Sequence, residues 1–399
     1  MTPPPPSAPF SIVCLSSQEW AAALPTNRQQ IMRRAAARGH DVLFVETGDF
    51  IGKHLSRLVL GPGRRSLARR LFRGEPAQSG ITVRKALNLL PWGQRYRLCD
   101  RANGAFNGFA VGRAARRLHA PRVAWLYDPR ATWAIGGVGD AISIYDCVDD
   151  YAQQTGNDRS RRLVAKADGR AAAGVDLVFT TTRALRDRHL EANPATHLVG
   201  NVGDFAHFAA GADASSARPD LRDLPKPVLG FAGNILPGKL DPRLLETLAD
   251  HFSHGTVVLA GPVDAGLAAS VARLSARPNV ASLGPVPYEE LPRVVASFDV
   301  ALIPYETNDY TRNVFPLKLF EYLAAGKPVV ATGLPELEGM EPDVVVASEG
   351  ELVAATTAAL ALVAPADVQR RQALAARNTW ETRTERLLAL AAETLEGAR

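Results

Sequence analysis

Residues 316–332 read PLKLFEYLAAGKPVVAT, and this stretch decides the fold that the sequence predicts. Pro316 suits the first position of a helix and Gly326 suits its C-terminal stop, while the closing VVAT is typical of a buried strand. Lys318 and Glu321 are three residues apart, so on a helix they share one face. A helix that runs directly into a buried strand indicates an α/β sheet. Its two charges are either a surface ion pair or contacts for an anionic ligand that carries hydroxyl groups.

The alternation of apolar runs and helical patterns continues on both sides of this segment. Runs typical of strands lie at 10–16, 40–46, 82–90, 122–127, 142–148, 177–182, 196–201, 227–233, 255–261, 279–284, 299–305 and 328–332. Helical patterns lie at 26–39, 95–118, 161–174, 183–193, 241–252, 264–275, 288–297 and 317–325. Strands that alternate with helices predict parallel sheets, so we expect an α/β fold of two doubly wound, Rossmann-like domains. Ligands of such sheets bind at the carboxyl ends of the strands, and we expect them in a cleft that the two domains face.

Composition divides the chain further. Residues 1–9 are rich in proline and predict a disordered lead, whereas residues 206–226 lack periodicity and predict a linker. We therefore expect an N-terminal domain at 10–205, a C-terminal domain at 227–365 and C-terminal helices at 366–399.

The charge of the chain is uneven. The net charge of +5 combines +12 over residues 1–205 with −7 over residues 206–399, which suggests two domains with different partners. No apolar run approaches the roughly 20 residues that a membrane span needs. The first residues lack the basic segment of a signal peptide, and Cys14, Cys99 and Cys147 form no CxxC pair. We therefore expect a reduced, cytoplasmic setting.

The segment FAGNILPGKLD (231–241) combines a strand end with glycines that allow a ligand close to the backbone. Gly233, Gly238 and Lys239 nearly match a P-loop, but Leu240 stands where that motif needs a metal-binding hydroxyl. We exclude a P-loop NTPase and expect either a loop that cradles phosphate or an ordinary turn between a strand and a helix.

The helix in 316–332 is a second candidate for phosphate contact. A helix N-terminus offers free N–H groups and the positive end of a dipole, which suits a diphosphate, and Lys318 could add its charge. Glu321 could accept hydrogen bonds from the vicinal hydroxyls of a ribose.

The C-terminal half resembles the nucleotide-sugar half of glycosyltransferases with the two-domain GT-B fold, family 4-like or group 1. The stretches that carry this resemblance are NVASLGPVPYEELP, FDVALIPY and PLKLFEYLAAGKPVVAT. In the first half, YDCVDDY (145–151), LVFTTTRAL (177–185) and VGNVGDFAHF (199–208) resemble the same family in the same order. The resemblance spans nearly the whole chain after residue 10. It implies a nucleotide-diphosphate sugar as donor substrate, no cofactor, and a final helix that could cross back to the first domain.

The resemblance also implies a set of donor contacts. Glu321 would bind the donor ribose, Lys239 the diphosphate, and the backbone around Val286 the base. Many family members carry a second glutamate eight positions before the first, where this chain has Asn313. This departure leaves the sugar contact and the retaining or inverting outcome open. The full set of implied donor contacts is Gly233, Asn234, Lys239, Val286, Asn313, Lys318 and Glu321.

The segment YDCVDDY places carboxylates directly after a predicted strand, at the edge of the sheet where ligands bind. Asp149 or Asp150 could act as the base that takes the proton of an acceptor hydroxyl. Metal binding and helix capping are the alternatives for these two carboxylates. The candidate acceptor contacts in the first half are Trp20, Arg28, Gln29 and Asp128.

The histidines of the chain bear on a possible metal site. The eight histidines form no HExxH motif and no His/Cys cluster, so we expect no metal site.

The stretch RRSLARRLFR (64–73) holds five arginines, with Leu67 and Leu71 on a common face. It is either a solvated basic helix or a contact to an anionic membrane surface. Nucleic acid is not expected as a partner, because no nucleic-acid-binding module accompanies the stretch.

We therefore expect a glycosyltransferase that moves a sugar from a nucleotide sugar to a glycan or lipid-linked acceptor. Its place would be the synthesis of a cell-surface polysaccharide or glycolipid, in the cytoplasm and peripheral on the inner membrane face. The alternatives are a nucleotide-sugar epimerase of the same fold and a catalytically silent nucleotide-binding partner protein.

Overall fold

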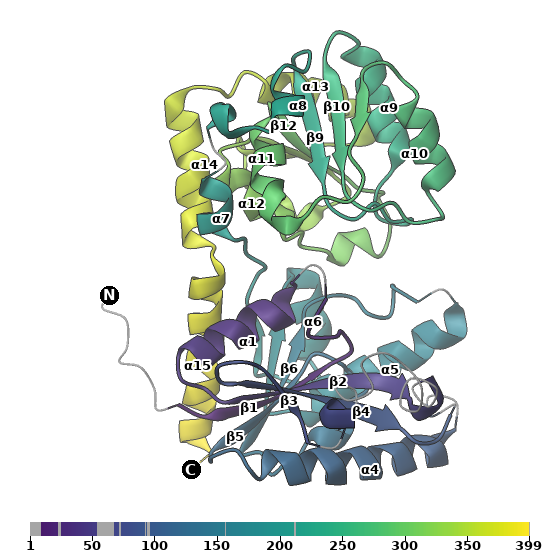
Figure 1. Cartoon of the computed structure of the whole chain (residues 1–399), viewed down its shortest axis with the longest axis vertical. Coiled ribbons are helices and arrows are strands. Elements are labelled where there is room, and N and C mark those ends of the chain that lie inside the picture. The colour runs from purple at the N-terminus through teal and green to yellow at the C-terminus, as the bar shows by residue number, and fades with distance from the viewer. Residues whose placement is uncertain are drawn as a thin grey trace. The chain divides into compact units, whose positions relative to one another are not determined.

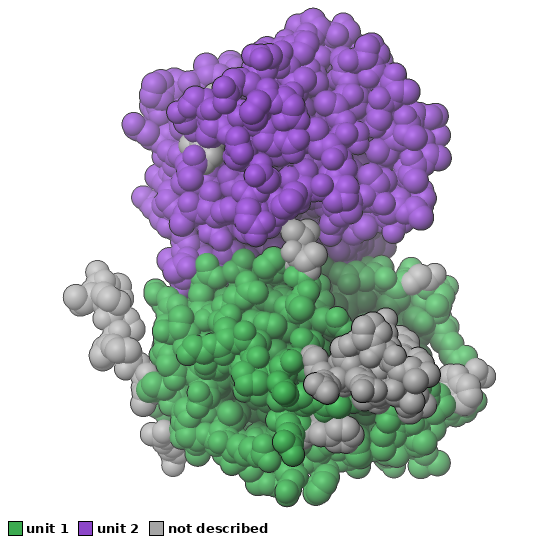
Figure 2. Space-filling model, in the orientation of Figure 1, with its two compact units in different colours: residues 1–199, 383–399 green, residues 200–382 purple. Residues whose placement is uncertain are grey.

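The computed structural model describes residues 9–22, 25–53, 68–71, 73–91, 93, 96–155, 157–210 and 213–398. The chain divides into two compact units, which Figure 2 colours separately. Unit 1 contains residues 1–199 and 383–399, and unit 2 contains residues 200–382. Residues 1–8 of the predicted proline-rich lead lie outside the described residues.

Unit 1 is built on an eight-stranded sheet in the order β3-β4-β2-β1-β5-β6-β7-β8 (Figure 1). The strands are β1 (Ser11–Ser16), β2 (Val42–Phe50), β3 (Glu75–Gln78), β4 (Ile81–Asn88), β5 (Arg122–Leu126), β6 (Ile142–Cys147), β7 (Leu177–Thr180) and β8 (Thr196–Leu198). Strand β1 is parallel to both of its neighbours, β2 and β5, so the order of strands reverses between β1 and β5. The helices are α1 (Asn27–Ala37), α4 (Arg97–Ala115), α5 (Asp158–Gly174), α6 (Arg183–Leu190) and most of α15 (Trp380–Gly397).

Unit 2 is built on a six-stranded parallel sheet in the order β11-β10-β9-β12-β13-β14. The strands are β9 (Val228–Ala232), β10 (Thr256–Ala260), β11 (Val280–Ser282), β12 (Val300–Pro304), β13 (Val329–Thr332) and β14 (Val344–Val346). The helices are α7 (Phe205–Ala209), α8 (Pro219–Arg222), α9 (Pro242–His251), α10 (Ala268–Ser275), α11 (Leu291–Ala296), α12 (Lys318–Ala324), α13 (Leu352–Ala359) and α14 (Pro365–Arg377). This is the strand order of a dinucleotide-binding fold, with its reversal between β9 and β12. The predicted pair of doubly wound sheets is confirmed.

Three short features differ from the expectation. Strand β3 is an exposed antiparallel edge strand and contains Pro76, which an edge tolerates because the proline need not donate to a neighbour. Strand β14 was also not predicted. The expected linker 206–226 instead begins within α7 and includes α8, and its Phe208 and Leu221 are buried in the core of unit 2. These helices are too short to show periodicity, and the units divide at residues 199 and 200.

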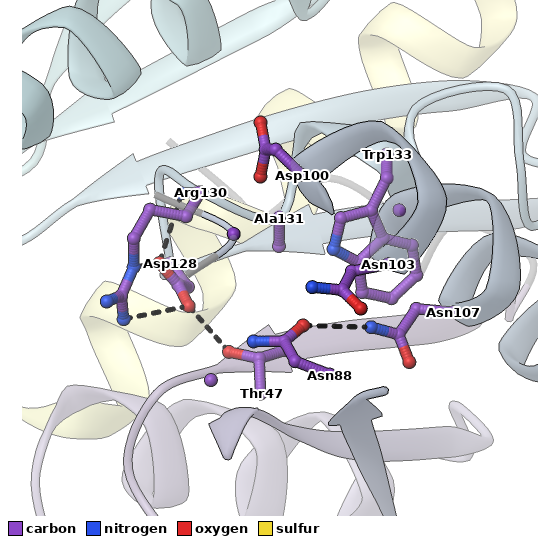
Figure 3. Close-up of a pocket in the computed structure, with 12 residues that line it drawn as sticks. Thr47, Asn88, Asp100, Asn103, Asn107, Asp128, Arg130, Ala131 and Trp133 are labelled. Atoms are coloured by element: carbon purple, nitrogen blue, oxygen red, sulfur yellow. Dashed lines mark hydrogen bonds and ion pairs between the residues drawn. The ribbon is translucent and has the colours of Figure 1, made fainter. Parts of the chain in front are cut away.

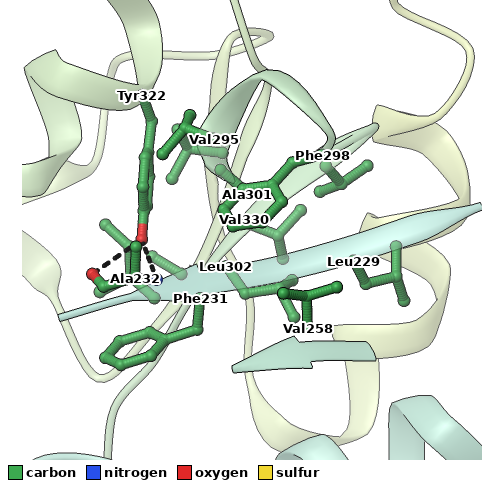
Figure 4. Packing of buried hydrophobic residues seen from close by; sticks show 14 of the residues in the cluster. Leu229, Phe231, Ala232, Val258, Val295, Phe298, Ala301, Leu302, Tyr322 and Val330 are labelled. Atoms are coloured by element: carbon green, nitrogen blue, oxygen red, sulfur yellow. Dashed lines mark hydrogen bonds between the residues drawn. The ribbon is translucent and has the colours of Figure 1, made fainter. Parts of the chain in front are cut away.

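The core of unit 2 fixes helix α12 against strand β9 (Figure 4). Phe298 packs over Gly230 of β9, where any Cβ would lie 2.1 Å from the phenyl ring. The buried hydroxyl of Tyr322 accepts a hydrogen bond from Ala232 N (2.8 Å) and donates to Ala232 O (3.1 Å). Because Tyr322 is on α12 and Ala232 ends β9, this pair of bonds sets the position of the helix at the carboxyl end of the sheet.

A buried ion pair joins α15 to the sheet of unit 1. Arg383 is fully buried, donates to the carbonyl oxygen of Val199, and has its Nη2 3.6 Å from Asp146 Oδ1. Burial raises the pKa of Asp146 and lowers the pKa of Arg383, and each charge opposes the shift of the other. Removing one partner of such a pair leaves an uncompensated buried charge, so the contact holds α15 firmly against β6 and β8.

Candidate functional site

The strand-order reversal of unit 2 brings one face of α12 to the ends of β9 and β12. In open α/β sheets this reversal leaves a crevice outside the carboxyl ends of the two central strands. Gly233 directly follows β9, and Tyr305 directly follows β12.

Lys318 lies over the end of β9. Its Nζ is 3.7 Å from the centroid of the Phe231 ring, and a Cβ at Gly233 would lie 2.5 Å from the same nitrogen. Gly233 also has a φ of +141°, which side chains rarely adopt. Glycine is therefore required at 233, both for the backbone and for the space that the ammonium group occupies.

Lys239 comes to the same place from the loop after β9. Its Nζ is 5.5 Å from the ring centroid of Tyr305, and Lys318 Nζ is 5.6 Å from that ring. Burial holds the pKa of Lys318 well below its usual value, the nearby Lys239 charge lowers it further, and Glu321 opposes the shift. Burial and the Lys239 charge thus both disfavour the charged form of Lys318, and a strongly shifted pKa of this kind is typical of functional sites.

Glu321 lies one helical turn beyond Lys318. Burial raises its pKa to about 7, Lys318 opposes this shift, and Asp204 adds to it. In the described part of the chain no ion pair of 4.0 Å or less joins Glu321 to Lys318, so the two charges are not a closed surface pair. Gly203 passes close to this turn, because a Cβ there would lie 2.9 Å from Glu321 N.

Several backbone amides of the loop after β9 already have partners within the protein. Gly233 N donates to Ala260 O, Lys239 N donates to Leu236 O, and Gly238 N donates to Glu306 Oε1. To an anion site the loop can contribute the side-chain charge of Lys239 and the space above Gly233.

The remaining predicted donor contacts are Asn234, Val286 and Asn313, and their surroundings differ. Asn234 is exposed, and Val286 is half-buried against the core of unit 2. Asn313 ends a short 3₁₀ turn and donates to Asp309 O (3.2 Å). Sequence reasoning missed Tyr305, whose ring centroid lies 5.5 Å from Lys239 Nζ and 5.6 Å from Lys318 Nζ, although a tyrosine directly after a buried strand could have suggested it.

Unit 1 has a polar pocket at the carboxyl ends of β2, β4 and β5 (Figure 3). Helix α4 forms one wall of the pocket, and Trp133 forms part of another. Gly104 of α4 allows the close approach of Trp133, since a Cβ there would lie 3.2 Å from the Trp133 Cβ. The lining residues are Thr47, Gly48, Asn88, Gly93, Asp100, Asn103, Gly104, Asn107, Asp128, Arg130, Ala131 and Trp133.

Asp128 is the predicted acceptor contact that lines this pocket. It is buried and accepts hydrogen bonds from Thr47 Oγ1 (2.6 Å) and Arg130 Nε (2.8 Å). Burial opposes ionisation of Asp128, but the Arg130 charge and these hydrogen bonds outweigh it and hold its pKa below the usual value. Asp128 is therefore a fixed negative charge at the wall of the pocket.

The other acceptor candidates have partners within the protein. Gln29 is fully buried and closes the capping box at the start of α1, where its Oε1 accepts from Thr26 N (3.0 Å). Arg28 is buried and donates to the Tyr151 hydroxyl (2.8 Å). Trp20 packs edge-on against Phe44 with ring centroids 5.0 Å apart. A role of these three residues in acceptor binding stays a prediction.

The two candidate bases differ in their surroundings. Asp150 is buried and paired with Arg188, whose Nη2 is 2.6 Å from Asp150 Oδ2. Asp149 is half-buried and accepts from Gln154 Nε2 (2.6 Å) and Asp150 N (2.9 Å). Asp149 is therefore the carboxylate that is more open to a substrate.

The fold assembles one cluster that the sequence spacing did not indicate. Ligand atoms of Cys147, Asp168 and His189 all lie within 4.8 Å of one another, and the three residues are buried. Asp168 Oδ1 accepts from the Tyr145 hydroxyl (2.5 Å), and Asp168 Oδ2 is 3.4 Å from His189 Nε2. These residues could hold a metal ion, but their contacts also form a network that joins β6, α5 and α6. The expectation of no metal site stays a prediction.

Residues 64–67 and 72 of the basic stretch 64–73 lie outside the described residues. Of its arginines, Arg70 has acidic partners, with Nε 2.7 Å from Glu75 Oε2 and Nη1 3.4 Å from Glu46 Oε1. Among the helices described, none has both the length and the apolar character needed to cross a bilayer.

Comparison with known proteins identifies the domain that carries the lysine pair. Residues 226–364 match the family described as "Glycosyl transferases group 1". The family that the sequence resembles is thereby confirmed.

One relative is similar in sequence. The chain is 33% identical over 208 residues to the "Putative teichuronic acid biosynthesis glycosyltransferase TuaH" of Bacillus subtilis (strain 168). The match covers 50% of this chain and 52% of the relative. The chain thus matches about half the length of this curated relative.

Solved structures share the fold across nearly the whole chain. The sucrose-phosphate synthase (tll1590) of Thermosynechococcus elongatus has a TM-score of 0.71 at 15% identity, with 97% of this chain and all of that chain covered. Anabaena Alr3699/HepE in complex with UDP-glucose has a TM-score of 0.64 at 16% identity, with 96% and 100% covered. At such identities the likeness shows the fold alone.

The raised pKa of Glu321 predicts a pH dependence of stability. The folded state holds the Glu321 proton up to about pH 7, whereas the unfolded chain releases it near the ordinary value of 4.5. Between these values the folded state binds more protons, so stability falls as the pH rises. We expect Glu321→Gln to unfold at a higher temperature than the wild type at about pH 8 and to show a smaller difference at about pH 5.

The measurement is differential scanning calorimetry at both pH values. Glu338→Gln, which changes an exposed carboxyl of the same unit, is the control and should show no such difference. A Glu321→Gln variant with the same pH profile as the wild type would contradict the assigned environment of Glu321.

Proposed function

We propose that this chain is a glycosyltransferase that uses a nucleotide-diphosphate sugar as donor. The single observation that supports it best is the pair of lysines at the strand-order reversal of a group 1 domain. Lys239 and Lys318 share the Tyr305 ring, and Glu321 lies one turn away on the Lys318 helix. Two cations suit a diphosphate, and a carboxylate suits the vicinal hydroxyls of a ribose.

In this proposal the lysines replace a metal ion. The diphosphate becomes the leaving group, and its developing charge is stabilised by ammonium groups that are already in position. Burial makes these charges unfavourable in the empty protein, and an anionic ligand removes that cost on binding. No cofactor is needed beyond the donor.

The acceptor, in this proposal, is a glycan that binds in the pocket of unit 1. An aromatic ring and planar polar side chains are the groups that contact the apolar and hydroxyl faces of sugars, and Trp133, Asn88, Asn103 and Asn107 provide them. Asp149 is the proposed base for the acceptor hydroxyl, since Asp150 is held by Arg188. The name of the Bacillus relative suggests an acceptor within a cell-surface polysaccharide, and the complexes of HepE suggest a uridine nucleotide as donor.

Donor binding can be tested by removing one charge at a time. Lys239→Gln, Lys318→Gln and Glu321→Ala should each weaken the affinity for the correct nucleotide sugar by about 10-fold or more, since a hydrogen bond to a charged group contributes about 1.5–3 kcal/mol. The donor is first found by thermal-shift screening against UDP, GDP, ADP and dTDP sugars, and affinities are then measured by calorimetry.

Lys226→Gln is the matched control, because Lys226 is an exposed lysine of the same unit. The Lys318 and Glu321 variants should fold at least as stably as the wild type, because each removes a buried charge. Unchanged affinity in all three variants would contradict the proposed donor site. Nucleotide release that needs no acceptor would instead favour an epimerase or hydrolase, and binding without any turnover would favour a silent partner protein.

The proposed base gives a separate prediction. Asp149→Asn should lower the transfer rate by about 10²–10⁴-fold, because proton transfer by a positioned base contributes that much. Donor affinity and thermal stability should remain close to those of the wild type. Asp150→Asn should instead lower stability, because it leaves the charge of Arg188 without its buried partner. Full activity of Asp149→Asn in a transfer assay with the identified donor would exclude it as the base.

A further inference from the structure

Exposed apolar side chains gather around one helix of unit 1. Ten large apolar residues are exposed in the described part of the chain, and six of them lie between residues 89 and 109. Leu98 is 78% exposed and Phe109 is 69% exposed. Scattered exposed apolar residues are ordinary, but a contiguous group of this kind marks an interaction surface. The six are Leu89, Leu90, Tyr96, Leu98, Phe106 and Phe109.

The geometry of α4 places the most exposed of these residues on one side. Leu98 and Phe109 are separated by about three helical turns, and Ala102 and Ala105 continue the same exposed face between them. Phe106 lies beside this stripe. Figure 1 shows α4 along the outer side of unit 1.

Leu89 and Leu90 are held beside the same helix. The side chain of Asn103 on α4 accepts from Leu90 N and donates to Leu90 O, each at 2.9 Å. These bonds place Leu90 on the pocket side of α4, whereas the exposed stripe of Leu98, Phe106 and Phe109 forms the outer surface of the helix, which we call the α4 face. We define it by Leu98, Phe106 and Phe109, the exposed large apolar residues of α4.

Positive charge surrounds the α4 face. Five arginines and one acidic residue, Asp100, lie between residues 97 and 117. Asp100 lines the pocket of unit 1. None of the five arginines has an ion-pair partner within the described residues. They are Arg97, Arg101, Arg113, Arg116 and Arg117.

We propose that the α4 face docks unit 1 on the surface of an anionic lipid bilayer. Apolar side chains surrounded by arginines are the pattern of a helix that lies in the membrane interface, where leucine and phenylalanine enter the lipid and the arginines meet the headgroup phosphates. A second copy of this chain fits less well, because a symmetric contact would bring arginines against arginines. Nucleic acid would meet the arginines but would leave Leu98 and Phe109 in water.

The other side of α4 connects this surface to the pocket. Asp100, Asn103 and Asn107 line the pocket, as Figure 3 shows, and the two asparagines are buried. One helix therefore has the pocket on one side and the membrane contact on the other. A lipid-linked acceptor could keep its lipid in the bilayer while its sugar enters the pocket. The entry of the sugar into the pocket rests on the proposed transferase activity, whereas the docking of the α4 face on the bilayer does not.

The test is flotation of the purified chain with vesicles of phosphatidylcholine alone or mixed with phosphatidylglycerol. We expect the wild type to float with the anionic vesicles and not with the neutral ones, and to detach as salt is raised. Combined replacement Leu98→Ser, Phe106→Ser and Phe109→Ser should abolish flotation. Combined replacement Arg101→Gln, Arg113→Gln and Arg116→Gln should weaken vesicle affinity by roughly 100-fold.

The control removes exposed apolar side chains elsewhere, by Leu190→Ser, Leu198→Ser and Val363→Ser, and should float like the wild type. Thermal unfolding and nucleotide-sugar binding of every variant should match the wild type, which separates a failed docking surface from a failed fold or a wrong donor site. A wild type that does not float with anionic vesicles would overturn the proposal. So would apolar variants that float normally, or a wild-type dimer in solution that the apolar replacements convert to monomer.

Discussion

The hydroxyl of Tyr322, bonded to both backbone groups of Ala232, is the contact on which the proposed donor site depends. It joins α12 to the last residue of β9 and so fixes where Lys318 and Glu321 lie relative to the end of the sheet. The hydroxyl is buried, and loss of either bond would leave a buried backbone group unsatisfied. Gly230 and Gly233 complete the arrangement, because each leaves space for a side chain that α12 or its neighbours place over β9.

This rigid placement forces an unfavourable set of charges together. The pKa of Lys318 is lowered and the pKa of Glu321 is raised, both chiefly through burial. A surface ion pair would relieve both shifts, yet the structure does not form one between these two residues. Charges kept at a cost to the empty protein are typical of sites whose ligand supplies the compensating charge. The same argument favours Asp149 over Asp150 as the proposed base, because the charge of Asp150 is already compensated by Arg188.

Much of the fold and part of the site could be predicted from the sequence. Alternating apolar runs and helical patterns predicted both sheets, because buried parallel strands and amphipathic helices leave strong periodic signals. Lys239, Lys318 and Gly233 were found because they stand at strand ends and helix starts. Tyr305 was missed, since its only sequence signal is its place directly after a buried strand, which does not by itself mark a binding residue. The cluster of Cys147, Asp168 and His189 could not be predicted, because its members lie on three elements and only the packing of these elements brings them together. The chain from 206 to 226 was misjudged because one buried residue per short helix gives no periodicity.

The account's central claim is that a nucleotide diphosphate is held at the ends of β9 and β12 by Lys239 and Lys318. Its most direct test is a crystal structure of the chain with the nucleotide sugar selected by binding. The account predicts diphosphate oxygens within about 3.2 Å of one or both lysine Nζ atoms, with the ribose hydroxyls at the Glu321 carboxylate. A nucleotide bound with its phosphates away from both lysines would contradict the claim.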